Sequence, residues 1–290
     1  MGFLILDKPA GLTSHDCVAR IRRRYGLRRV GHGGTLDPAV TGVLPVALGP
    51  ATRLLPYLDG RKRYEGVIQL GLRTSSDDLE GDVLSTAAVP PLSGEAIEAL
   101  LAPFRGEILQ RPPQVSAVHV EGERAYARAR RGETMELAAR PVTIEALELI
   151  RWDQERQQLH LDVTCSAGTY IRSLARDLGD SLGCGGSLAR LRRSAALGFT
   201  LGDSLSLEQL ADDPAPAPLP PLRALSHLSQ HQLPASDWQS WRCGRALDDP
   251  EQRPTDTVVV ILAPDGNLAG MARATGSGQL QPKLVFDAAG

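Results

Sequence analysis

Residues 30–49 read VGHGGTLDPAVTGVLPVALG, and this stretch decides how the whole chain is interpreted. Its first half is rich in glycine and proline and its second half is apolar, so we expect a loop that packs directly against a core. Pro38 restricts Asp37 to an extended or turn conformation. The glycines allow a ligand to approach the backbone closely, so the loop can hold one carboxylate in a fixed orientation. A structural turn, in which Asp37 binds nearby amides, is the alternative.

Short strands and helices surround this loop without the regular spacing of a βαβ fold. Hydrophobic periodicity predicts strands over 2–6, 64–70, 142–150 and 158–165, and helices over 14–25, 93–101 and 169–182 with Ser14, Ser93 and Thr169 as N-caps. We therefore predict the α+β class, with a mixed, largely antiparallel sheet flanked by helices.

The alternating prolines of residues 212–222 are typical of an extended spacer. Beyond them, strands are predicted over 257–262, 267–273 and 279–286, with a hairpin turn at Asp265-Gly266. These observations predict a large domain over residues 1–228, which includes the spacer, and a small all-β domain over residues 229–290.

Charge is distributed unevenly along the chain. Residues 1–200 carry 26 basic and 23 acidic side chains, whereas residues 201–290 carry 6 and 11. Arginine supplies all but three of the 32 basic residues, and its planar fork suits phosphate groups and bases. Nucleic acid is therefore a candidate partner, although codon bias explains an arginine excess equally well.

Several classes of protein are disfavoured. No apolar run reaches the length of a membrane span and the N-terminus does not read as a signal peptide, so we expect a cytoplasmic protein. The four cysteines lack metal-ligand spacing, which predicts free thiols that are mostly buried. Neither a Walker A motif nor a Rossmann GxGxxG is present, which argues against nucleotide hydrolysis and dinucleotide redox chemistry.

Two further polar segments stand out. Residues 167–176 read AGTYIRSLAR and place Arg172 near the start of a helix, where the helix dipole does not favour a cation. Arg172 is therefore expected to face a specific anion; an exposed surface arginine is the alternative. Tyr64 lies at the start of a strand and is either a core residue or an aromatic platform for a base.

Taken together, these segments resemble the TruB-type tRNA pseudouridine synthases. The resemblance rests on ordered blocks across about 200 residues: LDKPAGLTSHD (6–16), VGHGGTLDPAVTGVLPVALGPATR (30–53), KRYEGVIQLG (62–71), QRPPQVSAVHVEG (110–122), GERAYARARRGE (122–133), CSAGTYIRSLARDLG (165–179) and LRRSAALGF (191–199). It implies a pseudouridine synthase catalytic domain over 1–228 and a PUA-like RNA-binding domain over 229–290.

The resemblance also implies the reaction. The uracil of the tRNA T-loop uridine, conventionally position 55, leaves C1′ at N1 and rejoins it through C5, and no cofactor or metal is needed. The implied partner is the tRNA T-stem loop, and the sequence favours a monomer that needs no protein partner. An RNA-binding or tRNA-folding factor without turnover is the alternative from another class.

Residue roles follow from the matched blocks. Asp37 matches the catalytic aspartate and Arg172 matches its arginine partner, which would favour the charged carboxylate. Tyr64 matches the tyrosine that stacks on the target base; whether it also removes the C5 proton is left open. His32 matches the histidine that helps to hold the extruded nucleotide, whose extrusion costs about a few kcal/mol.

Three further residues are candidate substrate-binding residues. Lys8 and Arg53 fall in matched blocks and either support the site or bind phosphate, with a purely structural role as the alternative. Asp77, or its neighbour Asp78, is a candidate hydrogen-bond acceptor in the pocket.

Overall fold

The structure is a computed structural model that describes residues 1–116, 118–120, 122–129, 131–133 and 135–287. None of the helices within these ranges is long and apolar enough to cross a membrane.

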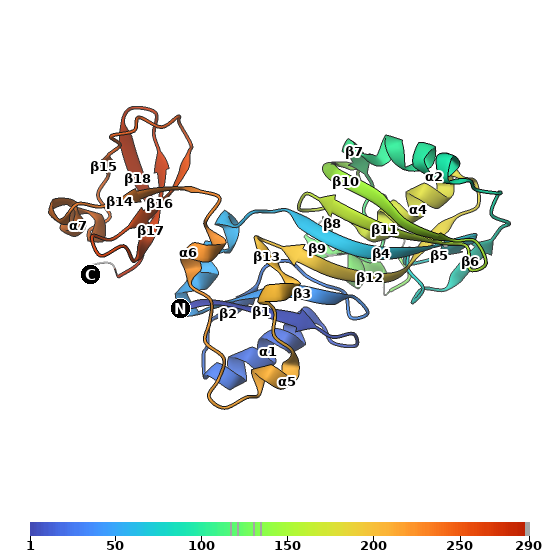
Figure 1. The fold of residues 1–290 in the computed structure, drawn as a ribbon, viewed down its shortest axis with the longest axis horizontal. Helices are drawn as coiled ribbons and strands as arrows, with labels where there is room; N and C mark the ends of the chain where they lie inside the picture. The colour runs from blue at the N-terminus through green and yellow to red at the C-terminus, as the bar shows by residue number, and fades with distance from the viewer. Residues whose placement is uncertain (117, 121, 130, 134, 288–290) are drawn as a thin grey trace.

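One large sheet forms the centre of the protein (Figure 1). Its main path runs β1-β3-β12-β4-β11-β10-β7, with β2 paired to β3 and β13 paired to β12. The strands are β1 (Gly2–Lys8), β2 (Val30–His32), β3 (Thr41–Leu48), β4 (Lys62–Leu70), β7 (Gly106–Gln110), β10 (Arg140–Asp153), β11 (Gln158–Cys165), β12 (Gly186–Ala196) and β13 (Phe199–Thr200). Among the described strands of this sheet, only β3 and β12 pair in parallel, which confirms the predicted largely antiparallel sheet.

Helices and short strands flank this sheet. The longer helices are α1 (Ser14–Tyr25), α2 (Gly94–Leu101) and α4 (Ile171–Ser181); shorter elements are α3 (Ala125–Ala129), α5 (Leu207–Leu210), α6 (Pro221–Ala224), the 3-10 helices η1 (Gly49–Tyr57), η2 (Ala102–Phe104) and η3 (Leu201–Asp203), and the paired strands β5 (Leu72–Thr74) with β6 (Val83–Thr86) and β8 (His119–Val120) with β9 (Glu123–Arg124). Figure 1 shows α1 and α5 together beneath β1 and β3. Together these elements match the predicted α+β class.

Two of the three predicted N-caps are wrong. Ser93 caps α2 as expected, because its side chain accepts the N–H of Ala96. Thr13 caps α1 in place of Ser14, in a capping box with Asp16. Tyr170 occupies the N-cap position of α4 without a side-chain cap, so Thr169 does not cap that helix.

Residues 229–285 build a second, five-stranded sheet. Its order is β14-β16-β17-β18-β15, and its elements are β14 (Ser229–Gln232), β15 (Leu247–Asp248), β16 (Val258–Leu262), β17 (Leu268–Ala274), β18 (Gln279–Val285) and the helix α7 (Ala235–Arg242). The helix is a departure from the expected all-β module; its Trp241 is fully buried and donates to the Ala269 carbonyl at 3.1 Å.

The end of the spacer contacts the large sheet. Leu219 exchanges two backbone hydrogen bonds with Phe3 of β1, and α6 begins at Pro221. A shared apolar cluster then joins the two sheets, with Leu54 of η1 and Leu225 on one side and Met271 of β17 on the other. Figure 1 shows α6 and η1 between the C-terminal sheet and the large one.

The site region depends on one close approach between strands. Arg193 of β12 lies beside Gly42 of β3. Gly42 has φ +105°, and a Cβ there would lie 2.2 Å from the Arg193 carbonyl oxygen. Only glycine fits this position without strain. The contact places the residue 33–37 loop, which leads into β3, against β12.

Candidate active site

Asp37 lies in the loop between β2 and β3, whose backbone is fixed from two sides. Ser14 Oγ donates to the Leu36 carbonyl at 3.2 Å and accepts the Leu36 N–H at 2.9 Å. Lys8 is fully buried, and its Nζ donates to the Pro38 carbonyl at 3.1 Å and to two other carbonyls. The Asp37 side chain is nevertheless 43% exposed. The loop therefore presents an accessible carboxylate on a well-anchored backbone.

Arg172 pairs with this carboxylate. Its Nη2 lies 3.0 Å from Asp37 Oδ2, although 135 residues separate the two in sequence. The guanidinium also donates to the carbonyls of Ser76 at 3.1 Å and Val115 at 2.9 Å, and Asp78 Oδ2 lies 3.5 Å from Nη1. The Arg172 side chain is only 8% exposed, and these partners hold its guanidinium in one orientation, with Nη2 directed at Asp37.

The start of α4 is held by the Gln110 side chain of β7 and by the backbone of the segment after this strand. The Gln110 amide accepts the Tyr170 N–H at 2.8 Å and donates to the Tyr170 carbonyl at 3.1 Å. Ser173 Oγ donates to the Arg111 carbonyl at 2.8 Å. These bonds take the place of a side-chain cap and fix the position of Arg172 between them.

Tyr64 lies on β4 opposite Arg193 of β12 and is 6% exposed. Burial raises the pKa of its hydroxyl, and the nearby Arg193 guanidinium opposes that shift. The charge of Asp37 also raises this pKa. At neutral pH the phenol is therefore protonated.

His32 ends β2 and is half-buried. Its ring meets the ring of His15 edge-on, with centroids 5.4 Å apart. Burial lowers its pKa, as do the nearby His15 and Arg193, so the imidazole is neutral at neutral pH. Within the described residues its buried Nδ1 has no hydrogen-bond partner.

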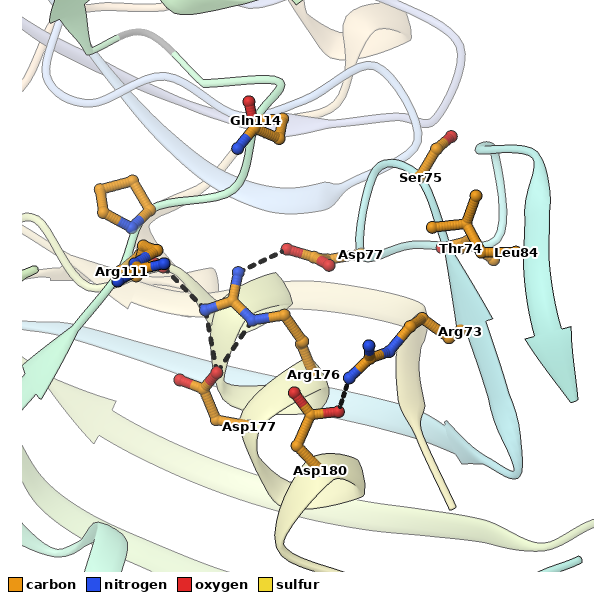
Figure 2. A pocket seen from close by; sticks show the side chains of 11 residues that line it. Arg73, Thr74, Ser75, Asp77, Leu84, Arg111, Gln114, Arg176, Asp177 and Asp180 are labelled. Atoms are coloured by element: carbon orange, nitrogen blue, oxygen red, sulfur yellow. Dashed lines mark hydrogen bonds and ion pairs between the residues drawn. The ribbon is translucent and has the colours of Figure 1, made fainter. Parts of the chain in front are cut away.

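Asp77 and Asp78 point in different directions. Asp78 faces Arg172, whereas Asp77 Oδ2 lies 2.9 Å from Nη1 of Arg176, one helical turn further along α4. Burial raises the pKa of the Asp77 carboxyl, and Arg176 opposes the shift. Figure 2 shows this pair lining a pocket of about 450 Å³ together with Arg111. Arg172 and Asp37 do not line it, so the pocket adjoins their ion pair and does not contain it.

The structure places the two other candidates, Lys8 and Arg53, in different surroundings. Lys8 is fully buried with its ammonium group on backbone carbonyls, which fits support of the Asp37 loop and does not fit phosphate binding. Arg53 lies in η1, away from the site, where it donates to the Val285 carbonyl at 3.4 Å and lies 5.8 Å from the centre of the Phe286 ring. Arg53 therefore contacts the C-terminal sheet.

Four residues at the site were not predicted. Ser14 and Gln110 hold the loop and the start of α4, Arg193 lies beside Tyr64, and the hydroxyl of Tyr170 responds to the charges of Arg172 and Asp37. All four lie in the matched sequence blocks, and Tyr170 also lies in the polar segment, two residues before Arg172. All four cysteines are free, and three are buried, as predicted.

Comparisons with known proteins agree with this geometry. Residues 22–171 match the TruB family pseudouridylate synthase (N terminal domain), and residues 172–217 match the tRNA pseudouridylate synthase B C-terminal domain. The chain belongs to the TruB family of pseudouridine synthases. The family resemblance read from the sequence blocks is thus confirmed.

Full-length relatives support the same assignment. The chain is 64% identical over its whole length to the tRNA pseudouridine synthase B of Parasynechococcus marenigrum (strain WH8102), covering 98% of that protein. It is 58% identical to the protein of the same name from Synechococcus sp. (strain WH7803), covering all of this chain and 99% of that one.

Solved structures show the same fold. A chain in the structure of an H/ACA RNP bound to a substrate RNA containing 2'-deoxyuridine has a TM-score of 0.76 and 26% identity, over 98% of this chain and 84% of that one. A chain in the crystal structure of a Cbf5-Nop10-Gar1 complex has a TM-score of 0.74 and 26% identity, with the same coverage. The pseudouridine synthase fold of this TruB family member is therefore shown.

Proposed function

We propose that this chain is a tRNA pseudouridine synthase that isomerises the T-loop uridine at position 55, with Asp37 as the catalytic carboxylate. The ion pair between Asp37 and Arg172 carries the proposal. It joins a fixed, buried cation to an accessible carboxylate within a TruB family fold.

The reaction rearranges atoms of one nucleotide. The N1–C1′ bond breaks, the uracil turns, and the C5–C1′ bond forms; C5 loses its proton and N1 gains one, so no co-reactant is consumed. An ionised Asp37 assists the exchange, either by attack on the ribose or uracil or by promoting a glycal. Arg172 pairs with this carboxylate at 3.0 Å and holds it in position.

The other candidates bind and orient the nucleotide. Tyr64 stacks on the target base, and His32, neutral and with an unpartnered Nδ1 among the described residues, contacts the nucleotide extruded from the T loop. Asp77, held by Arg176, orders the loop that presents Asp78 and the Ser76 carbonyl to Arg172. Lys8 supports the loop of Asp37 through its hydrogen bond to the Pro38 carbonyl.

The C-terminal module extends the RNA-binding surface in this proposal. Residues 229–290 act as a PUA-like domain, and Arg53 and the shared apolar cluster fix it to the catalytic domain of residues 1–228. The enzyme acts on tRNA in the cytoplasm as a monomer, without a protein partner, cofactor or metal.

Mapping of pseudouridine in tRNA tests the proposal. Unmodified tRNA transcript is incubated with the protein, treated with a carbodiimide that marks pseudouridine, and read by reverse transcription. A single new stop at the T-loop uridine is expected, and a transcript with cytidine at that position should give none. A stop at another uridine would contradict the site specificity, and the absence of any stop would contradict the activity.

A further inference from the structure

Two cationic side chains meet beside Gly34, three residues before Asp37 in the same loop. Lys62 comes from the start of β4 and Arg193 from the adjacent strand β12. A Cβ on Gly34 would lie 3.4 Å from Arg193 Nη1 and 3.6 Å from Lys62 Nζ. Both cationic groups are therefore directed at the same point on the loop.

Among the residues that the structure describes, no carboxylate pairs with Lys62. It is half-buried, and among the described residues it forms neither a hydrogen bond nor an ion pair. Burial and the charge of Arg193 lower its pKa, and only Cys165 opposes them. Burial raises the pKa of the Cys165 thiol to about 11, so the thiol is neutral at pH 7 and supplies no negative charge.

Arg193 is fully buried and only partly satisfied. Its Nε donates to the Val43 carbonyl at 2.7 Å and its Nη2 to the Gly34 carbonyl at 3.1 Å. Within the described part of the chain, Nη1 has no hydrogen-bond partner, although the Tyr64 hydroxyl lies near the guanidinium. A buried charged donor without an acceptor is costly, so this arrangement is expected to serve a ligand.

The position of this pair identifies the class of ligand. Gly34 is half-exposed and carries no side chain, so nothing from this residue fills the space beside Lys62 Nζ and Arg193 Nη1, although Nη1 itself is buried. Its φ of +91° disfavours any side chain there. Two positive charges match a permanently ionised phosphate better than the neutral carbonyl oxygens of uracil. The target nucleotide itself brings phosphates close to Asp37 and Tyr64.

We propose that Lys62 Nζ and Arg193 Nη1 bind one phosphodiester group of the substrate RNA, next to the target uridine and above Gly34. This inference rests on the proposed function, because it takes the RNA as the source of the phosphate. It assigns to Lys62 a role in binding and no role in the bond exchange.

The kinetics of Lys62→Gln test this role. Loss of one charge-assisted contact should raise the KM for a T-stem-loop RNA roughly tenfold and leave kcat within about threefold of wild type. The slope of log KM against log salt concentration should fall by about 1. Lys62→Arg should recover most of the affinity. Arg63→Gln is the matched control, since Arg63 is exposed and already paired with Asp162 at 2.8 Å.

Neutral linkages in the RNA locate the phosphate. Methylphosphonates replace the phosphates around position 55 one at a time. One of them should weaken binding to the wild-type protein roughly tenfold and have little further effect on Lys62→Gln, because the two changes remove the same contact. Effects that multiply at every position would overturn the inference.

Two other outcomes distinguish a failure of this inference from a failure of the proposed function. A Lys62→Gln variant with a lower kcat and an unchanged KM would place the charge in the chemistry and overturn the phosphate role. Wild-type protein that binds the RNA but forms no pseudouridine would contradict the proposed function alone, because the binding arm with methylphosphonates still tests Lys62. Unfolding curves of each variant confirm that the fold is intact.

Discussion

Two buried arginines of this protein make opposite use of their carboxylate partners. Arg172 is 8% exposed, but its partner Asp37 is 43% exposed. Arg253, in the C-terminal module, is 6% exposed, and its partner Asp249 is only 1% exposed. Asp249 also accepts the Arg253 backbone N–H at 2.9 Å. A second carboxylate is near, since Glu251 Oε1 lies 2.5 Å from Arg253 Nη2.

The difference separates the proposed site from a structural contact. The pair of Arg253 and Asp249 is closed, so its charges serve the packing of the module. In the pair of Arg172 and Asp37, the arginine is buried and the carboxylate is exposed, so the Asp37 carboxylate stays accessible to a substrate. Burial of the arginine alone does not distinguish the two pairs, which differ in the exposure of Asp37 and Asp249.

Replacement of Arg172 tests the open pair and should give the largest effect of the following three. Arg172→Met removes the cation that pairs with Asp37 and the bonds to the Ser76 and Val115 carbonyls. We expect kcat for pseudouridine formation to fall by about 100- to 1,000-fold. Arg172→Lys should recover only part of it, because an ammonium lacks the fork. Activity near that of wild type in Arg172→Met would contradict a functional role for the pair of Arg172 and Asp37.

Replacement of Asp249 tests the closed pair. Asp249→Asn leaves the buried Arg253 with only the more exposed Glu251 as a partner. The free energy of unfolding should fall by about 2–3 kcal/mol, toward the lower end for a broken buried pair. Denaturant unfolding measures the loss. Below the unfolding transition kcat should stay within about twofold of wild type, and a large fall in kcat with normal stability would reverse the assignment.

The pH dependence of stability gives the smallest effect. Burial lowers the pKa of His32 below the 6.5 of the unfolded chain, so the folded state binds its proton less readily. The unfolding free energy should therefore fall as the pH drops from about 6.5 through the folded pKa. His32→Gln should flatten this slope in unfolding measurements between pH 7.5 and 5. The slope that remains reflects other groups such as His160, whose pKa burial also lowers. An unchanged slope would contradict a buried, neutral His32.

The sequence indicates the candidate residues better than their surroundings. Pro38 and the glycines mark the loop of Asp37, an arginine near a helix start marks Arg172, and the family resemblance implies that the two pair, as the structure shows. The order of the strands could not, because the contact of β3 with β12 depends on Gly42 fitting against the Arg193 backbone. No local pattern reveals such a long-range approach.

The sequence also does not reveal the different contacts of candidate residues of the same chemical type. Asp77 and Asp78 are adjacent, and only the folded loop directs Asp78 to Arg172 and Asp77 to Arg176. Lys8 and Arg53 are both basic residues in matched blocks, yet one is buried on carbonyls and the other lies against the C-terminal sheet. Burial and direction are tertiary properties, which a residue type does not determine.

Tritium release from RNA tests the central claim most directly. A tRNA transcript labelled at C5 of uracil loses its tritium when C5 bonds to the ribose. The wild-type protein should release one equivalent per target uridine, whereas Asp37→Asn should release at least about a thousandfold more slowly and still bind the RNA. Release by Asp37→Asn at the wild-type rate would contradict the role of this carboxylate.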